Sequence, residues 1–183
     1  MTYSRDGQAG IDFPGNFPFN LPAYSTAAWA VTDFELGGEK AVISTSFNGP
    51  VDNVTDRWLI SPKVNGITAN SFLFWEGFTD NADALDKCEV WVTSTIAGTT
   101  PTVDDFLADN ANKVMDFRMM PDEFNTYAAR LAPFAGADIY FAIRNVSFIP
   151  ARVILDDFEV KDAIRDDLGV KNLVLEPYWV SGP

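Results

Sequence analysis

The chain has 183 residues, 47% hydrophobic and 14% aromatic, so it can fill a sizeable core and is not disordered in composition. Its formal net charge is −13, with 26 acidic against 13 basic residues, which argues against a nucleic-acid partner. It has no histidine and a single cysteine, Cys88, which excludes histidine-based catalysis, histidine-ligated metals and an internal disulfide.

Residues 1–28 predict an extended N-terminal arm. The stretch GIDFPGNFPFNLPAYS holds three prolines, a density that disfavours regular helix and sheet. Phe13, Phe17 and Phe19 need an apolar surface, on this chain's own domain or on a neighbouring subunit. The first residues lack the charged and apolar regions of a secretory signal peptide.

Residues 29–160 predict the main domain. Short runs rich in β-branched and aromatic residues are separated by Gly, Pro, Asn and Asp: KAVISTSF, RWLISPKV, NSFLFWEGF, CEVWVTST, IYFAIRNVSF and ARVILDDFEV. One helix is expected in TPTVDDFLADNA, with Thr102 as N-cap and Asp105 completing a capping box. The fold class is therefore all-β, an antiparallel β-sandwich of jelly-roll type with one short helix. No run of about 18 apolar residues exists, so we expect no membrane insertion.

Residues 161–183 predict a C-terminal extension. DAIRDDLG favours about two helical turns and VKNLVLEPYWV one more strand. Tyr178 and Trp179 belong to an apolar set that requires burial on the domain or on a partner.

The positions of the five tryptophans and of the single cysteine predict which of them are buried in the core. Trp58, Trp75 and Trp91 stand in apolar strands and indicate core positions, as does Cys88. Trp29 and Trp179 lie nearer the arms, which favours exposure or contact with a partner.

Five segments in chain order resemble the cleaved-adhesin and choice-of-anchor J domains, bacterial surface jelly rolls related to the MAM domain. These are DRWLISPKV (56–64), SFLFWEGF (71–78), CEVWVTST (88–95), RLAPFAGADIYFAIRNVS (130–147) and LDDFEV (155–160). The resemblance implies a jelly roll with an adhesive role, and it implies that Trp58 packs between the two sheets. The region FPFNLPAYSTAAW has no glutamate where calcium-binding members carry an acid.

Asp156 poses a separate question. Strict alternation along RVILDDFEV places it on one face with Ile154, Phe158 and Val160. A bare buried carboxylate costs several kcal/mol, so it must be paired, hydrogen-bonded or bound to a metal. A β-bulge would shift the alternation and remove the difficulty.

Three partners for Asp156 are open. Arg144 is one, and backbone N–H groups of a crossing loop are another. The third is Ca²⁺, with Asp157 as a second ligand and oxygens from Asp33, Glu35 and Asp52. A hydrogen-bonded structural aspartate ranks first and calcium second, and no other cofactor is expected.

Function is expected to be non-enzymatic, as a binding or assembly module. One version is a structural or decoration protein of a larger particle such as a phage capsid, joined to protein subunits through its arms in an oligomer. The other is a carbohydrate- or protein-binding adhesin domain of a secreted bacterial protein. The location would be a virion or the cell surface.

A carboxylate-based glycosidase or lyase is the alternative from another class. The stretch TDNADALD offers Asp80, Asp83 and Asp86, but these acids are typical of a solvated turn, and no catalytic residue is assigned.

Overall fold

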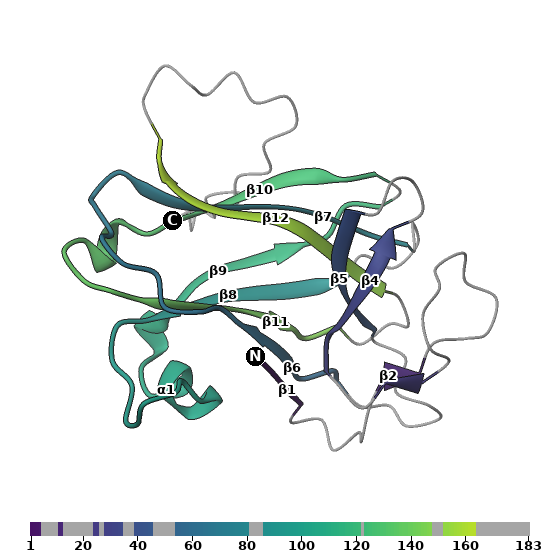
Figure 1. The fold of residues 1–183 in the computed structure, drawn as a ribbon, viewed down its shortest axis with the longest axis horizontal. Helices are drawn as coiled ribbons and strands as arrows, with labels where there is room; N and C mark the ends of the chain where they lie inside the picture. Colours follow the sequence, from purple (N-terminus) through teal and green to yellow (C-terminus); the bar gives the residue numbers. More distant parts are fainter. Residues whose placement is uncertain are drawn as a thin grey trace, which may run out of the picture.

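A computed structural model describes residues 1–4, 11–12, 24–25, 28–34, 39–45, 54–80, 86–121, 123–147 and 152–163. Two five-stranded sheets face one another (Figure 1). The first, called the β11 sheet, runs in the order β1 (Thr2–Ser4), β6 (Arg57–Ile60), β11 (Tyr140–Asn145), β8 (Lys87–Thr93) and β9 (Lys113–Arg118). The second, called the β12 sheet, runs in the order β10 (Asn125–Arg130), β7 (Ser71–Thr79), β12 (Arg152–Asp162), β5 (Glu39–Thr45) and β4 (Ala30–Phe34).

Neighbouring strands in both sheets are antiparallel, which confirms the predicted all-β sandwich. A two-stranded ribbon joins β2 (Ile11–Asp12) to β3 (Tyr24–Ser25). The helical elements are α1 (Val103–Leu107) and two 3₁₀ turns, η1 (Asn110–Asn112) and η2 (Ala132–Phe134). Within the described ranges, no helix has the length and apolar character needed to cross a membrane.

The main core fills the space between the sheets. Alternate residues of the strands point inward, among them Leu73 and Trp75 of β7 and Val90 of β8, each fully buried. Trp75 stacks on Tyr127 at 5.6 Å and meets the edge of Phe117 at 5.1 Å between ring centres. These contacts confirm Trp75 as a core residue.

Cys88 is fully buried in the same core. Burial raises the pKa of its thiol well above the usual value, so the neutral thiol packs as a small apolar group. The predicted structural role of this cysteine is confirmed.

Trp29 is 3% exposed and belongs to the main core. The expectation that it is exposed near the arm is wrong, because the segment before β4 is held against the domain. Ser44 of β5 donates a hydrogen bond from Oγ to the Ala28 carbonyl at 3.1 Å, which fixes the residue before Trp29.

The N-terminal residues form short strands where an extended arm is predicted. Residues 2–4 pair with β6, and the Met1 amine donates to the Ile60 carbonyl at 2.9 Å. The prediction that residues 1–28 form an arm without regular sheet is wrong at β1, β2 and β3, because these short strands lie before the first proline, Pro14, or after the third, Pro22. Phe13, Phe17, Phe19, Tyr178 and Trp179 lie outside the described residues, so their contacts stay predictions.

Candidate functional site

The outer face of the β11 sheet is covered by α1. Phe106 and Val103 of the helix are buried against Trp58 and Trp91, with ring centres of Trp58 and Phe106 5.9 Å apart. Figure 1 shows the helix on the side of this sheet away from β7 and β12. A ligand therefore cannot reach Trp58 and Trp91 on the outer face of the β11 sheet, because α1 covers them.

The start of α1 follows the predicted capping pattern. The Asp105 carboxylate accepts hydrogen bonds from the backbone N–H and the hydroxyl of Thr102, both at 2.8 Å. It also accepts from the Ala97 N–H at 2.8 Å, which ties the preceding loop to the helix. This predicted cap is confirmed.

Trp58 is fully buried, as predicted, but not between the sheets as the resemblance implies. Alternation along β6 turns Leu59 toward the main core and Trp58 outward, where α1 covers it.

A charged network borders these rings. Arg144 donates to Asp56 Oδ1 at 2.8 Å and to Glu89 Oε2 at 2.9 Å, and its guanidinium lies 5.0 Å from the centre of the Trp58 ring. The same two carboxylates accept the indole N–H groups, from Trp58 at 2.6 Å and from Trp91 at 2.8 Å. Each member satisfies another, so the network is structural. Arg144 is therefore committed here, and the idea that it partners Asp156 is wrong.

A β-bulge in β12 answers the question posed by Asp156. Asp156 is opposite Glu76 of β7, whereas Glu159 is opposite Phe74, so two residues of β12 face the single position of Trp75. Asp157 has a φ of 49°, in the left-handed region. The bulge places Asp156 outward and turns Phe158 and Val160 inward, so the prediction that all three share a face is wrong.

The Asp156 carboxylate accepts a hydrogen bond from the Asp157 N–H at 2.9 Å. This matches the hydrogen-bonded aspartate that ranks first among the sequence alternatives, although the donor belongs to the bulge and not to a crossing loop. Among the described residues, no three acidic or cysteine side chains gather as a metal site requires. Asp33 is described without its side chain and Glu35 and Asp52 not at all, so calcium at Asp156 and Asp157 stays a prediction.

The outer face of the β12 sheet carries a regular array of side chains, here called the β7 platform. Its centre is formed by Phe72, Phe74 and Glu76 of β7. One residue of β10 and one of β12 lie directly opposite each of these three residues. The three rows are Arg130–Phe72–Lys161, Ala128–Phe74–Glu159 and Thr126–Glu76–Asp156.

The two aromatic rings of the platform form a short continuous surface. Phe72 and Phe74 are both half-buried, with ring centres 6.0 Å apart and planes inclined by 33°. The Lys161 Nζ lies 5.1 Å from the centre of the Phe74 ring and 2.7 Å from Glu159 Oε2. Because the side chains of Lys161 and Glu159 are 53% and 57% exposed, they can move aside for a ligand.

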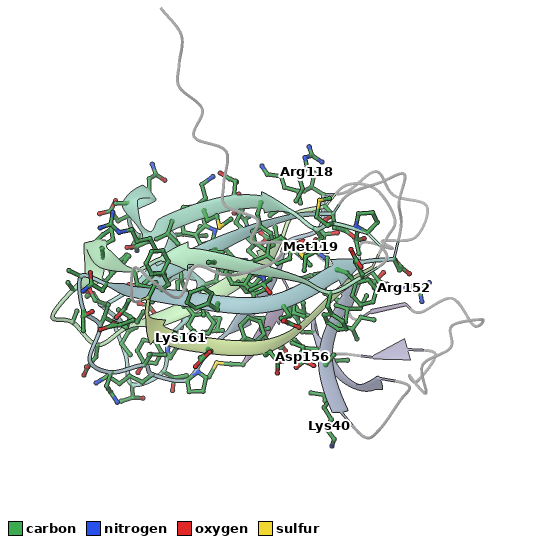
Figure 2. All side chains as sticks on the ribbon, turned by 90° about the horizontal axis from the view of Figure 1, so that it is seen from above. Lys40, Arg118, Met119, Arg152, Asp156 and Lys161 are labelled. Atoms are coloured by element: carbon green, nitrogen blue, oxygen red, sulfur yellow. The ribbon has the colours of Figure 1, made fainter. Side chains whose placement is uncertain are left out.

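The platform is polar at both ends. Arg130 is exposed, and its guanidinium forms no ion pair with any described residue. At the other end Glu76 and Asp156 stand opposite each other, and Glu76 accepts a hydrogen bond from Thr126 Oγ1 at 3.4 Å. Figure 2 shows Lys161 and Asp156 separated along β12.

Beyond Glu76 the same face becomes apolar and buried. Ile43, Phe78 and Ile154 form a small cluster, and Phe124 meets the edge of Phe78 at 4.9 Å. On β7, β10 and β12, the partly exposed aromatic side chains of this face are therefore the two rings of the platform.

Two acids of TDNADALD have specific structural partners. The Asp80 carboxylate accepts from the Arg152 N–H at 2.7 Å and pairs with Arg152 Nε at 2.6 Å. Asp86 is 1% exposed and accepts from Thr79 Oγ1 at 2.8 Å. The prediction of a solvated turn is wrong for both, because they fasten the end of β7 to its neighbours; Asp83 lies outside the described residues.

Sequence reasoning missed the platform. In SFLFWEGF both alternating sets are largely apolar, Phe72, Phe74 and Phe78 on one face and Leu73 and Trp75 on the other. The one usable signal was Glu76, which marks the set that faces outward.

Comparison with solved structures shows which fold this chain shares. No family model matches the sequence, and no curated protein sequence matches it. Among solved structures, the K1 cleaved adhesin domain of Lys-gingipain from Porphyromonas gingivalis W83 is 20% identical, over 89% of this chain and 99% of that one, with a TM-score of 0.50. The fold is that of an adhesin-like β-sandwich.

Two further structures share this fold. The K2 cleaved adhesin domain of Lys-gingipain is 18% identical over 88% of this chain and 99% of its own, with a TM-score of 0.53. TmCBM61, solved in complex with β-1,4-galactotriose, is 13% identical over 74% of this chain and 83% of its own, with a TM-score of 0.50. At these identities the likeness concerns the fold alone.

Proposed function

We propose that this chain is a non-catalytic glycan-binding module that holds an oligosaccharide on the β7 platform. The observation that carries the proposal is the half-buried pair Phe72 and Phe74, whose rings are partly open to solvent and flanked by charged side chains on the face opposite α1. A sugar ring presents C–H groups that pack on an aromatic face and hydroxyls that need hydrogen-bonding partners at its edge.

Each part of the platform has a role in this proposal. The rings of Phe72 and Phe74 supply the apolar support, and Glu76 and Asp156 supply acceptors for hydroxyl groups. The neighbouring structures support it, since they are adhesin domains and a module solved with a galactotriose. A cell-surface or extracellular location follows as part of the same proposal.

The particle-assembly version depends on the apolar arms, most of which lie outside the described residues. It therefore stays a prediction from the sequence. The platform belongs to the described domain, and for this reason glycan binding takes first place among the sequence alternatives.

A glycan array tests the proposal. The labelled wild-type chain is compared with the Phe72→Ala/Phe74→Ala double variant, and circular dichroism confirms that both are folded. Loss of two stacking surfaces, each worth about 1 kcal/mol, predicts that binding weakens roughly tenfold to a hundredfold.

The matched control is Tyr140→Ala, which removes a half-buried aromatic ring from the outer face of the other sheet. We expect this variant to bind as the wild type does. An array without any bound glycan would refute the proposal, as would equal weakening in the control.

A further inference from the structure

The end of the platform at Phe72 carries positive charge on both sides. Arg130 of β10 and Lys161 of β12 are each directly opposite Phe72 in the ladder. Adjacent strands lie about 4.8 Å apart, so the two side chains leave the sheet roughly 10 Å from each other and bracket a single sugar ring on Phe72. In a chain with a net charge of −13, two cations beside the half-buried rings of Phe72 and Phe74 form a local exception.

These two cations are available to a ligand. Arg130 is exposed and forms no ion pair with any described residue. Lys161 pairs with Glu159, but both side chains are more than half exposed, and such surface pairs contribute little and exchange readily. A guanidinium also matches the two oxygens of a carboxylate in a bidentate pair.

The opposite end of the platform has the reverse charge. Glu76 and Asp156 oppose each other across β7 and β12, where like charges repel. An acidic group there would meet two carboxylates, whereas a sugar hydroxyl would find acceptors. The platform therefore distinguishes the two ends of a ligand that lies along β7.

We propose that the glycan contains a uronic acid, held with its ring on Phe72 and its carboxylate between Arg130 and Lys161, while neutral hydroxyls face Glu76 and Asp156. This inference rests on the proposed function and names its ligand class. The overall negative charge disfavours densely sulfated chains, which would be repelled by the rest of the surface.

The test uses matched probes. Tri- and tetrasaccharides that carry one terminal galacturonic, glucuronic, mannuronic or guluronic acid on otherwise neutral sugars are each paired with their carboxyl methyl esters, which keep the sugars and linkages but lose the charge. Affinities are measured by calorimetry for the wild type, Arg130→Gln and Lys161→Gln. The control is Lys63→Gln, which changes the net charge equally at a lysine that pairs with Asp138 away from the platform.

We expect at least one acid to bind about tenfold more tightly than its ester, as a charge-assisted bidentate pair would provide. Arg130→Gln and Lys161→Gln should bring the ratio of the two affinities close to one, and Lys63→Gln should leave it unchanged. Glycan binding that depends on Phe72 and Phe74 but shows no preference for any acid would overturn the uronate inference and leave the proposed function standing.

Three further outcomes would overturn the uronate inference, and the last of them would also overturn the proposed function. Equal loss of preference in Lys63→Gln, or binding of sulfated glycans without uronates, would overturn the inference. If neither these probes nor any neutral glycan of the array binds, both the inference and the proposed function fail.

Discussion

The backbone conformation of Asp157 determines the face of the sheet on which Asp156 lies. The left-handed conformation of Asp157, with a φ of 49°, adds one residue to β12 and directs its N–H to the Asp156 carboxylate at 2.9 Å. Aspartate and asparagine tolerate this conformation, whereas a β-branched side chain is strongly disfavoured there. A single backbone setting thus orients Asp156 outward and sends Phe158 into the core, where it stacks on Phe141 at 5.9 Å.

Replacing Asp157 tests this setting. Asp157→Val should lower the free energy of unfolding by about 1–2 kcal/mol, the cost of a left-handed conformation for a β-branched residue. Asp157→Asn should remain within about 0.5 kcal/mol of the wild type, as surface substitutions usually do. Urea unfolding followed by fluorescence measures both. Equal stability of the two variants would show that the bulge does not depend on residue 157.

Asp162 provides a pH-dependent contact. Its Oδ1 accepts hydrogen bonds from the Ser71 hydroxyl at 2.6 Å and from the Thr68 hydroxyl at 2.7 Å, and these two bonds lower the pKa of the carboxyl. Because the folded-state pKa is lowered, the carboxylate contributes stability above the unfolded-state pKa of about 3.9, and this contribution is lost as the pH falls through the folded-state pKa.

Asp162→Asn should therefore be less stable than the wild type at pH 7, and the difference should narrow by pH 3. Urea unfolding at pH 7, 5 and 3 measures it. Asp157→Asn, which removes an exposed carboxylate from the same strand, is the control and should show no comparable gap. A gap of the same size at pH 7 and pH 3 would contradict the role given to Asp162.

At the scale of elements, β7 contributes side chains both to the main core and to the outer face of its sheet. Its inward set, Leu73 and Trp75, fills the main core, and its outward set supplies the platform rings. Gly77 of β7 is closely surrounded by Met119 and by the backbone of β12. A Cβ at this position would lie 2.6 Å from Met119 Cε and 2.8 Å from the Ile154 carbonyl oxygen.

Gly77→Ala should lower the free energy of unfolding by about 2–3 kcal/mol, because the backbone of β12 cannot move aside easily. Gly98→Ala is the matched control, since a Cβ there would meet nothing closer than the Thr100 carbonyl oxygen at 4.0 Å. Thermal and urea unfolding compare the two. Wild-type stability of Gly77→Ala would mean that β7 and β12 are less tightly fixed than the structure shows.

The sequence predicts the strands with strong β composition, and it predicts α1 together with its cap. It does not reveal β9 or β10. NTYAAR of β10 has two alanines and a terminal arginine, so its strand depends on pairing with β7 and not on its own composition. β9 carries the alternation of Met115 and Phe117 only briefly, between a 3₁₀ turn and a loop.

The site was less predictable than the fold. Whether Trp75 or Phe74 faces inward is decided by rings on other strands, Tyr127 and Phe117, which no local pattern reveals. The face of Asp156 depends on a bulge that leaves no signature in RVILDDFEV. The platform is a property of three strands brought together, and each strand alone is ambiguous.

At the scale of the whole molecule, the two outer faces of the sandwich differ in kind. On the β11 sheet, α1 covers Trp58 and Trp91, and the Arg144 network satisfies the charges beside them. On the β12 sheet, no described helix lies over Phe72 and Phe74, which are half-buried, and Arg130 is exposed. This asymmetry is the reason why we propose ligand binding on the outer face of the β12 sheet and a structural role for the residues under α1.

Hydrogen–deuterium exchange with and without the tightest glycan from the array tests this assignment most directly. Slower exchange is predicted in peptides from β7, β10 and β12, with no change in β6, β8 and α1. Protection confined to the face under α1, or spread evenly over both sheets, would contradict it.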